Sequence, residues 1–360
     1  MKNIYFTVGP SQTHPKLKEF MDRALLEDWP SLSHRSEKYM MLFSELSRNL
    51  KLFLKIPLDY SVFYSGCATE WMERSVQNCS SERTLHFSSG VFSHRFYEFS
   101  KEMGRNAKEV LCKEDFSFDL NDCPESFEPE LVCLTHNETS SGVMLPKTFI
   151  EQLKQKYPKA LFAIDIVSSV PFCKIDFSLF DVIFLSVQKG FGLPAGLGVV
   201  FVSPRALKKS CEIREGGRYT GFQHSFEHLQ KAFEKNQTPE TPNVLNMYLL
   251  NEVIKQMSIK GLDEIAKETE VKADLLFTAI NESKFTEIVV KNSEFRSPTT
   301  IVAKTTKNSK EIIEQLKTKG LVVGAGYGKD KNKFIRIANF PSHSLEMVKN
   351  LADAVRNLND

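Results

Sequence analysis

The sequence lacks several features that mark specialised classes of protein. It contains no run of about 18 apolar residues of the kind that crosses a membrane, and the segment Met1–Phe6 lacks the apolar core of a signal peptide. The formal net charge is only +2, which is too small to indicate nucleic acid or an anionic membrane as a partner. These absences predict a soluble, cytoplasmic protein that acts on small molecules.

Cysteine is present without any pattern that would suggest a structural role for sulfur. The seven cysteines are an odd number, and no two of them form a Cys-x-x-Cys pair. A disulfide framework or a zinc site is therefore not expected, and no metal is predicted. The cysteines are interpreted as reduced residues that pack in the core.

The sequence does contain a regular alternation of short apolar runs and helical patterns between about residues 60 and 205. Such alternation is typical of an α/β fold with a mostly parallel, doubly wound sheet. The run at 197–202 follows the run at 182–185 too closely for a helical crossover, so these two are expected to pair as an antiparallel hairpin. Strands are predicted at 60–64, 131–134, 161–164, 182–185 and 197–202, with a helix near 149–154.

The pattern changes after Pro239 and Pro242, where a smaller α+β unit is expected. Its closing helix is indicated by apolar residues that recur at three- and four-residue spacing from Leu345 to Val355, with Ser342 or Ser344 as the cap. The other elements are predicted as helices at 244–257, 262–280 and 311–317 and as strands at 299–303 and 334–338.

The length of the chain is sufficient for two cores. It has 360 residues, of which 41% are hydrophobic. We predict a large domain at 15–245 and a small C-terminal domain at 246–360, with the segment 1–14 near the active site.

Lys189 is the residue that most directly indicates chemistry. It follows the apolar run at 182–185 and precedes a glycine-rich stretch that ends at Gly198. A solvated surface lysine needs neither the strand nor the glycines. A lysine that forms an imine needs a rigid base, a crowded approach and partial desolvation that lowers its pKa. We interpret Lys189 as a Schiff-base lysine.

A carboxylate is expected beside this lysine. Asp165 ends the apolar run at 161–164, and ligands in parallel α/β sheets bind at the carboxyl ends of strands. The side chains of Asp165 and Lys189 should therefore face one cleft. A cofactor with a pyridine ring and an aldehyde needs this pair, a lysine to bind the aldehyde and an acid to keep the ring nitrogen protonated.

Three further segments lie at the expected junctions between strands and helices. Ser65–Glu70 opens a helical pattern, so backbone N–H groups are available there for a phosphate. Phe92 begins another helix, and its ring suits stacking on a flat cofactor. An ordinary turn and a core phenylalanine are the alternatives for these two. The polar cluster Thr135–Gly142 follows the strand at 131–134.

The order of these motifs resembles that of the class V aminotransferases, which are fold-type I enzymes dependent on pyridoxal 5'-phosphate. The resemblance covers nearly the whole chain and implies a fold-type I transferase, a ping-pong transamination between an amino acid and a 2-oxo acid, and a homodimer with active sites at the interface. The motifs that carry it are Phe6–Ser11, Ser33–Ser36, Ser65-Gly66, Gly90–Phe92, His136–Thr139, Asp165, Gln188-Lys189, Thr241–Asn243 and Ile335–Ile337.

The resemblance implies roles for individual residues at the reacting end of the site. Lys189 would bind the cofactor and move the proton of the substrate, and Asp165 would pair with the pyridine nitrogen. Phe92 would stack on the ring, where the family often has tryptophan, and Thr139 would lie near the ring hydroxyl. Arg336 would bind the substrate α-carboxylate, for which a planar guanidinium is well suited.

The resemblance also implies a set of residues around the cofactor phosphate. The backbone of Ala68 and Thr69 would bind it together with Gln188 and Ser168. Thr241 would reach it from the other subunit of the dimer.

The substrate is less clearly indicated, because the resemblance is shared by phosphoserine aminotransferases and by alanine or serine–glyoxylate aminotransferases. His34 and Arg35 would bind a substrate phosphate across the dimer interface, but related enzymes carry a similar pair. Thr69 stands where phosphoserine enzymes have an arginine, and their His-Arg pair shortly before the position of Arg336 is missing. We expect phosphoserine with 2-oxoglutarate, in serine biosynthesis, and keep the glyoxylate type as the alternative. Three lysines near the missing pair either replace it or are simply solvated, namely Lys329, Lys331 and Lys333.

Two other classes of function are weaker alternatives. A cysteine desulfurase-like lyase needs a nucleophilic cysteine in the C-terminal half, and the last cysteine is Cys211. A non-enzymatic binding protein with this fold would not need Lys189, Asp165 and Arg336 together.

Overall fold

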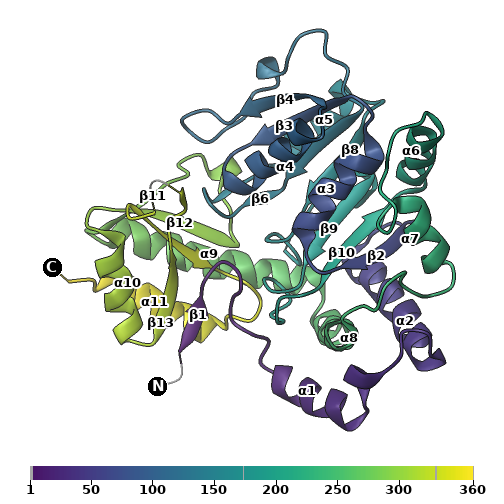
Figure 1. The fold of residues 1–360 in the computed structure, drawn as a ribbon. Helices are drawn as coiled ribbons and strands as arrows, with labels where there is room; N and C mark the ends of the chain where they lie inside the picture. The colour runs from purple at the N-terminus through teal and green to yellow at the C-terminus, as the bar shows by residue number, and fades with distance from the viewer. Residues whose placement is uncertain (1–2, 173, 329–330, 360) are drawn as a thin grey trace.

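The computed structural model describes residues 3–172, 174–328 and 331–359, and two sheets organise it (Figure 1). The larger sheet contains β2 (Ser61–Ser65), β3 (Arg83–Ser88), β4 (Asn106–Leu111), β5 (Leu131–Thr135), β8 (Leu161–Asp165), β9 (Val182–Ser186) and β10 (Gly198–Val202). The smaller sheet contains β1 (Ile4–Phe6), β11 (Thr286–Ile288), β12 (Thr300–Thr305), β13 (Leu321–Ala325) and β14 (Phe334–Ala338), and a short hairpin is formed by β6 (Asn137–Glu138) and β7 (Val143–Met144).

The larger sheet has the strand order β2-β10-β9-β8-β5-β3-β4. The neighbours from β9 to β4 are parallel, whereas β10 is antiparallel to both β9 and β2. In the β9–β10 pair, Val182 lies opposite Val202 and Ser186 lies opposite Gly198. The predicted mostly parallel sheet and its antiparallel hairpin are confirmed.

Helices cover both faces of this sheet, because the side chains of a strand alternate between its two faces. On β9, Ile183 and Leu185 pack in one core, and Val182 and Phe184 pack in another. The first core includes side chains of α2 (Glu37–Leu54), α5 (Lys147–Lys156) and α8 (Val244–Lys260). The second includes α3 (Ala68–Cys79), α4 (Val91–Glu102), α6 (Pro204–Glu215) and α7 (Phe226–Phe233).

The smaller sheet has its own core, formed with α9 (Leu262–Glu282), α10 (Ser309–Thr318) and α11 (Leu345–Arg356). Helix α11 is capped by Ser344, whose hydroxyl accepts a hydrogen bond from the Met347 N–H at 3.2 Å, so Ser344 rather than Ser342 is the cap. Strand β1 pairs in parallel with β13, which places the N-terminal segment in this unit, where both ends of the chain lie (Figure 1). The remaining short elements are α1 (Leu17–Leu26) and the 3-10 turns Trp29–Ser31, Leu120–Asp122, Phe177–Leu179 and Ser293–Phe295.

The boundary predicted after residue 245 lies at the start of α8. The apolar side chains of α8, such as Leu249 and Ile254, belong to the core of the larger sheet. The domain limits 15–245 and 246–360 stay a prediction. Within the described ranges, every helix is too short or too polar to cross a membrane.

The cysteines differ in their surroundings. Cys79 and Cys133 are buried, as is Cys123, whereas Cys112 and Cys211 are partly exposed. Cys67 is exposed in the turn between β2 and α3, so its interpretation as a core residue is wrong: that turn opens on a cavity. Cys173 lies outside the described residues.

Candidate active site

A cavity of about 360 Å³ lies at the carboxyl ends of β8 and β9. Residues from the N-terminal segment and from the smaller sheet complete its wall, so both units contribute to it. It brings together nine of the residues predicted from the sequence, namely Ala68, Thr69, Phe92, Thr139, Asp165, Ser168, Gln188, Lys189 and Arg336.

The other predicted residues do not line this cavity within the single chain. Arg35 hydrogen-bonds to the side chain of Gln237 and to the carbonyl of Pro239, at 3.3 Å for the latter. His34 lies edge-on to Tyr39. Thr241 is exposed, as are Lys331 and Lys333, and Lys329 lies outside the described residues.

Lys189 lies three residues beyond the end of β9, in a buried turn. Its side chain is only 9% exposed, and its Nζ lies 5.5 Å from the centroid of the Phe92 ring. Gly9 of the N-terminal segment packs directly on it, because a Cβ at Gly9 would come within 2.7 Å of the Lys189 Cε. Burial lowers the pKa of Lys189 from 10.5 to about 8, although Asp165 and Glu138 oppose this shift. A lysine with such a pKa is readily available as a nucleophilic amine.

Asp165 is the last residue of β8 and is buried. Its Oδ1 accepts a hydrogen bond from the Val167 N–H at 2.8 Å. Burial raises the pKa of Asp165 from 3.8 to about 6, against the opposing effects of the Val167 N–H and of Lys189. A buried carboxylate is strongly stabilised by a cationic partner, such as a protonated ring nitrogen.

The N-terminus of α3 forms one end of the cavity. The Ala68 N–H donates to the Ser186 hydroxyl at 2.7 Å, which anchors the first turn of α3 to the end of β9. Close approach is possible because the facing residue is Gly198, where a Cβ would lie 2.5 Å from the carbonyl carbon of Cys67. Beyond Gly66 there is open space at the helix N-terminus, where an anion is favoured by the helix dipole.

Arg336 on β14 forms the wall opposite the larger sheet. Its Nε donates to the Ala325 carbonyl at 2.7 Å, and its Nη1 donates to the Thr139 carbonyl at 3.4 Å. The guanidinium carbon lies 5.4 Å from the centroid of the Tyr327 ring. Burial is the main cause that lowers the pKa of Arg336. The guanidinium is thereby oriented and partly desolvated, as carboxylate recognition requires.

Ser168 connects the two units. Its hydroxyl donates to the Asn137 carbonyl and accepts from the Asn137 Nδ2, each at 2.7 Å. Thr299, just before β12, donates to the Ser168 carbonyl at 2.7 Å. These bonds occupy the Ser168 hydroxyl within the chain, and its predicted role at the cofactor phosphate stays a prediction.

The groups around the cavity fit pyridoxal 5'-phosphate. Thr135 Oγ1 and Asn137 Oδ1 are buried polar atoms of lining residues and have no hydrogen-bond partner within the described part of the chain. Buried polar groups normally have partners, so a polar ligand is expected beside them. The lysine, the buried carboxylate, the aromatic ring and the helix N-terminus supply the remaining contacts that an aldehyde, a pyridine ring and a phosphate need.

Several residues of the site were missed from the sequence. No role is predicted for Ser186, and Gly9 and Asn137 are predicted only as parts of motifs. Tyr327, which packs between Phe92 and Arg336, had no signal in the sequence. A polar residue at the end of an otherwise apolar strand would have been the signal for Ser186.

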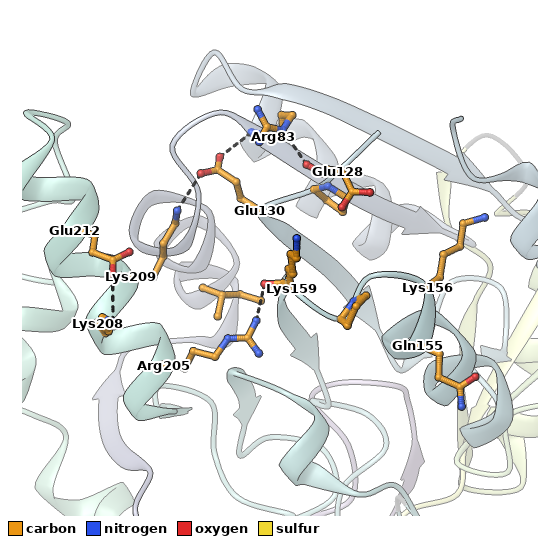
Figure 2. Close-up of a pocket in the computed structure, with 13 residues that line it drawn as sticks. Arg83, Glu128, Glu130, Gln155, Lys156, Lys159, Arg205, Lys208, Lys209 and Glu212 are labelled. Atoms are coloured by element: carbon orange, nitrogen blue, oxygen red, sulfur yellow. Dashed lines mark hydrogen bonds and ion pairs between the residues drawn. The ribbon is translucent and has the colours of Figure 1, made fainter. Parts of the chain in front are cut away.

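A larger hollow of about 960 Å³ lies at the opposite end of the larger sheet (Figure 2). Its charged side chains bond mainly to neighbouring protein groups: Lys209 pairs with Glu130 at 3.0 Å, and Arg205 donates to the Lys159 carbonyl at 2.8 Å. It contains none of the residues predicted for the active site.

Comparisons with known proteins agree with this geometry. The family model described as aminotransferase class-V matches residues 10–331. Phosphoserine aminotransferase of Rhodococcus opacus is 26% identical, over 97% of this chain and 93% of its own. The structure of a phosphoserine aminotransferase from Cytophaga hutchinsonii is 42% identical and covers 98% of both chains with a TM-score of 0.95. An alanine–glyoxylate aminotransferase from Nostoc shares the fold, with 21% identity, a TM-score of 0.80 and coverage of 99% and 95%. The chain is therefore a member of the class V aminotransferases, transaminases that use pyridoxal 5'-phosphate.

Proposed function

We propose that this protein exchanges an amino group between phosphoserine and 2-oxoglutarate, as a step of serine biosynthesis in the cytoplasm. The observation that carries the proposal is the 42% identity over 98% of the chain to a phosphoserine aminotransferase of known structure. The glyoxylate type is the second candidate, but the similarity to the Nostoc enzyme, at 21% identity, supports only the common fold.

The chemistry at the reacting atoms is assigned to two residues, Asp165 and Lys189. Bound pyridoxal 5'-phosphate supplies an electron sink for the bond to the substrate α-hydrogen. Asp165 keeps the ring nitrogen protonated, and this pairing is favoured because its carboxylate is buried. Lys189 would hold the aldehyde group of the cofactor and, as a free amine, would act as the general base that takes the proton from the substrate α-carbon. Its lowered pKa supports that role, since the free amine is then available near neutral pH.

Substrate and cofactor are oriented by the wall of the cavity. Arg336 would bind the α-carboxylate through its three remaining N–H groups, one on Nη1 and two on Nη2. Phe92 would stack on the ring, and Thr139 would lie near the ring hydroxyl. The phosphate of the cofactor is assigned to the backbone of Ala68 and Thr69 and to Gln188 and Ser168. The Ala68 N–H would have to leave the Ser186 hydroxyl for it, and the Ser168 hydroxyl would have to leave Asn137. N–H groups at a helix N-terminus are well suited to this anion.

The phosphate of the substrate is assigned to a second copy of the chain. Lys189 and Arg336 are the Lys and Arg residues that line the cavity within the described chain, and both already have roles. His34 and Arg35, with Thr241 for the cofactor phosphate, would reach the site from the partner of a homodimer. The exposed apolar side chains of Met41 (73%) and Phe222 (69%) near these segments support an interface there.

A single-turnover titration tests the substrate. The visible absorbance band of the bound cofactor is followed while phosphoserine, glutamate, alanine and serine are added separately to purified holoenzyme. Loss of the band with phosphoserine and glutamate, at concentrations where alanine and serine have no effect, is the expected result. Loss with alanine or serine while phosphoserine is inert would replace the proposal by the glyoxylate type.

The role of the second subunit is tested by Arg35→Ala. The KM for phosphoserine should rise about tenfold or more, because one charge-assisted contact is lost, while the KM for glutamate stays within twofold. Arg48→Ala, also in the N-terminal part of the chain, is the control. Equal changes for both amino donors would remove Arg35 from the phosphate site.

A further inference from the structure

Glu138 occupies an unusual place beside the cavity. It lies on β6 between Asn137 and Thr139, which both line the cavity, and its own side chain is fully buried. Its carboxylate is bonded to the first turn of α4, the helix that carries Phe92. Glu138 therefore connects helix α4, which carries Phe92, to the segment that carries the cavity residues Asn137 and Thr139.

The carboxylate accepts five hydrogen bonds. Its Oε2 accepts from the Phe92 N–H at 3.0 Å, from the Ser93 N–H at 2.8 Å and from the Ser93 hydroxyl at 2.9 Å. Its Oε1 accepts from the Ser140 N–H at 3.0 Å and from the Ser140 hydroxyl at 2.7 Å. Ser140 in turn accepts from the Val91 N–H at 2.9 Å. Oε2 thus fixes two consecutive backbone N–H groups at the start of α4, and Oε1 fixes Ser140, which binds a third.

The fit around this carboxylate is tight. A Cβ at Gly90 would come within 2.2 Å of the Ser140 hydroxyl and 2.6 Å of the Glu138 Cγ. Glu138 forms none of the ion pairs found among the described residues, so its charge is compensated directly by these five donors and by the α4 dipole, and at longer range by the cations of Lys189 and Arg336. Movement of the first turn of α4 would leave a buried carboxylate without donors, which is strongly unfavourable.

We propose that Glu138 is a positioning residue, which fixes the first turn of α4 so that the Phe92 ring keeps its place over the cofactor. The Phe92 ring lies 5.5 Å from the Lys189 Nζ and 5.7 Å from the Tyr327 ring, between the two units. The inference rests on the proposed role of Phe92 at the cofactor ring and is independent of the amino donor.

The chain offers a matched control at the other end of the sheet. Glu130, labelled in Figure 2, accepts from the Ser81, Glu82 and Arg83 N–H groups and from the Ser81 hydroxyl. It is a partly buried carboxylate that also fixes backbone N–H groups, but it pairs with Lys209 and lines the distant hollow. If a broken carboxylate network alone lowered the cofactor affinity, the affinity should fall by a similar factor in Glu130→Gln and Glu138→Gln.

The test compares these two variants as holoenzymes. A glutamine keeps one acceptor oxygen but turns an NH₂ toward either the α4 donors or the Ser140 donors. Either arrangement should loosen the first turn of α4 in Glu138→Gln, because Ser140 itself binds the Val91 N–H. We expect cofactor affinity about tenfold lower, as expected when stacking is impaired, and a weaker visible circular dichroism band of the bound cofactor. Glu130→Gln should keep both within twofold. Equal loss of affinity and of the dichroism band in the two variants would overturn the proposal.

A double-mutant cycle with Phe92→Leu separates this inference from the role of Phe92. If Glu138 acts through Phe92, Glu138→Gln should change the affinity of the Phe92→Leu protein by less than twofold. Full additivity overturns the inference. An unchanged cofactor affinity and dichroism band in Phe92→Leu alone would instead overturn the proposed place of Phe92.

If Glu138→Gln does not fold, Ser140→Ala replaces it. The cofactor affinity of this variant should fall about threefold, since one hydroxyl donor is removed. An unchanged affinity would also overturn the inference.

Discussion

The two ends of the larger sheet both carry ionisable side chains, but the protein disfavours the charged forms at one end and stabilises them at the other. At the carboxyl end, Lys189 and Asp165 are buried, and burial shifts both pKa values toward the neutral forms. At the amino end, Glu130 also experiences burial, but hydrogen bonds from Ser81, Arg83, Glu82 and Lys209 outweigh it and lower its pKa to about 2. The charges there are stabilised by the protein itself.

This difference argues against the larger hollow as the active site. Most of its charged side chains are bonded to neighbouring protein groups, so little is gained when a ligand binds (Figure 2). The smaller cavity retains groups whose charged forms are disfavoured, and buried polar atoms without partners. Perturbed groups of this kind are typical of functional sites. The size of a hollow and its number of charged side chains indicate a functional site less well than such perturbed groups do.

The largest difference between the two ends of the sheet is expected in turnover when a lysine is removed from each. In Lys189→Ala, turnover in a steady-state assay should fall by about 10⁴-fold or more, because proton transfer by this amine is lost. Lys209→Ala removes a lysine at the amino end and should retain wild-type turnover within twofold. Substantial turnover by the Lys189 variant would contradict the central assignment.

Loss of Arg336 should have the next largest effect. We expect kcat/KM of Arg336→Ala to fall about 100- to 1000-fold for both amino donor and oxo acid, since a desolvated charge-assisted contact to the carboxylate is removed. Arg336→Lys should not restore the rate, because an ammonium cannot form the planar paired contact. The control is Arg205→Ala in the distant hollow, and a KM unchanged for both substrates in Arg336→Ala would exclude the carboxylate role.

The sequence was sufficient to predict the strands that hold the chemistry. Strands β8 and β9 are uninterrupted apolar runs with every residue buried, which makes them recognisable, and Asp165 and Lys189 follow from their ends. Strands β3 and β4 were not predicted. In β3 the polar residues Thr84 and His86 are buried, and β4 lies at the edge of the sheet with most of its side chains partly exposed. Neither strand has a simple apolar pattern.

The parts of the site that the sequence did not indicate depend on contacts between distant segments. Strand β1 has three residues and is recognisable only through its pairing with β13. Tyr327 and Gly9 reach the cavity from the smaller unit, and Glu138 binds the N–H of Phe92, which lies 46 residues earlier in the chain. The predicted roles of His34, Arg35 and Thr241 depend on a second copy of the chain, so contacts within one chain do not bring these residues to the cavity.

The cost of burying Lys189 should be measurable in the apoprotein. With a folded pKa of about 8 and an ordinary value of 10.5, the charged amine destabilises the fold at pH 7, and this penalty disappears as the pH rises from 8 to 10.5. Apo Lys189→Met should therefore unfold in urea with a free energy up to about 3 kcal/mol larger at pH 7, and the difference should shrink toward pH 10.5. The matched substitution Lys208→Met, at an exposed lysine, should show no such pH dependence. A difference that is constant from pH 7 to 10.5 would contradict the desolvated state of Lys189.

The smallest effect is expected at Glu130, and it should concern stability alone. Its lowered pKa means that the ionised carboxylate stabilises the fold above pH 4.5, and that this contribution is lost as the pH falls from 4.5 toward 2. Glu130→Gln should lower the free energy of unfolding by about 2 kcal/mol at pH 7, with a smaller difference at pH 3, while kcat and KM stay unchanged. Glu212→Gln, which removes the exposed partner of Lys208, should cost less than about 0.5 kcal/mol. A Glu130 variant that loses activity without losing stability would mean that the amino end of the sheet takes part in function, and the contrast between the two ends would no longer hold.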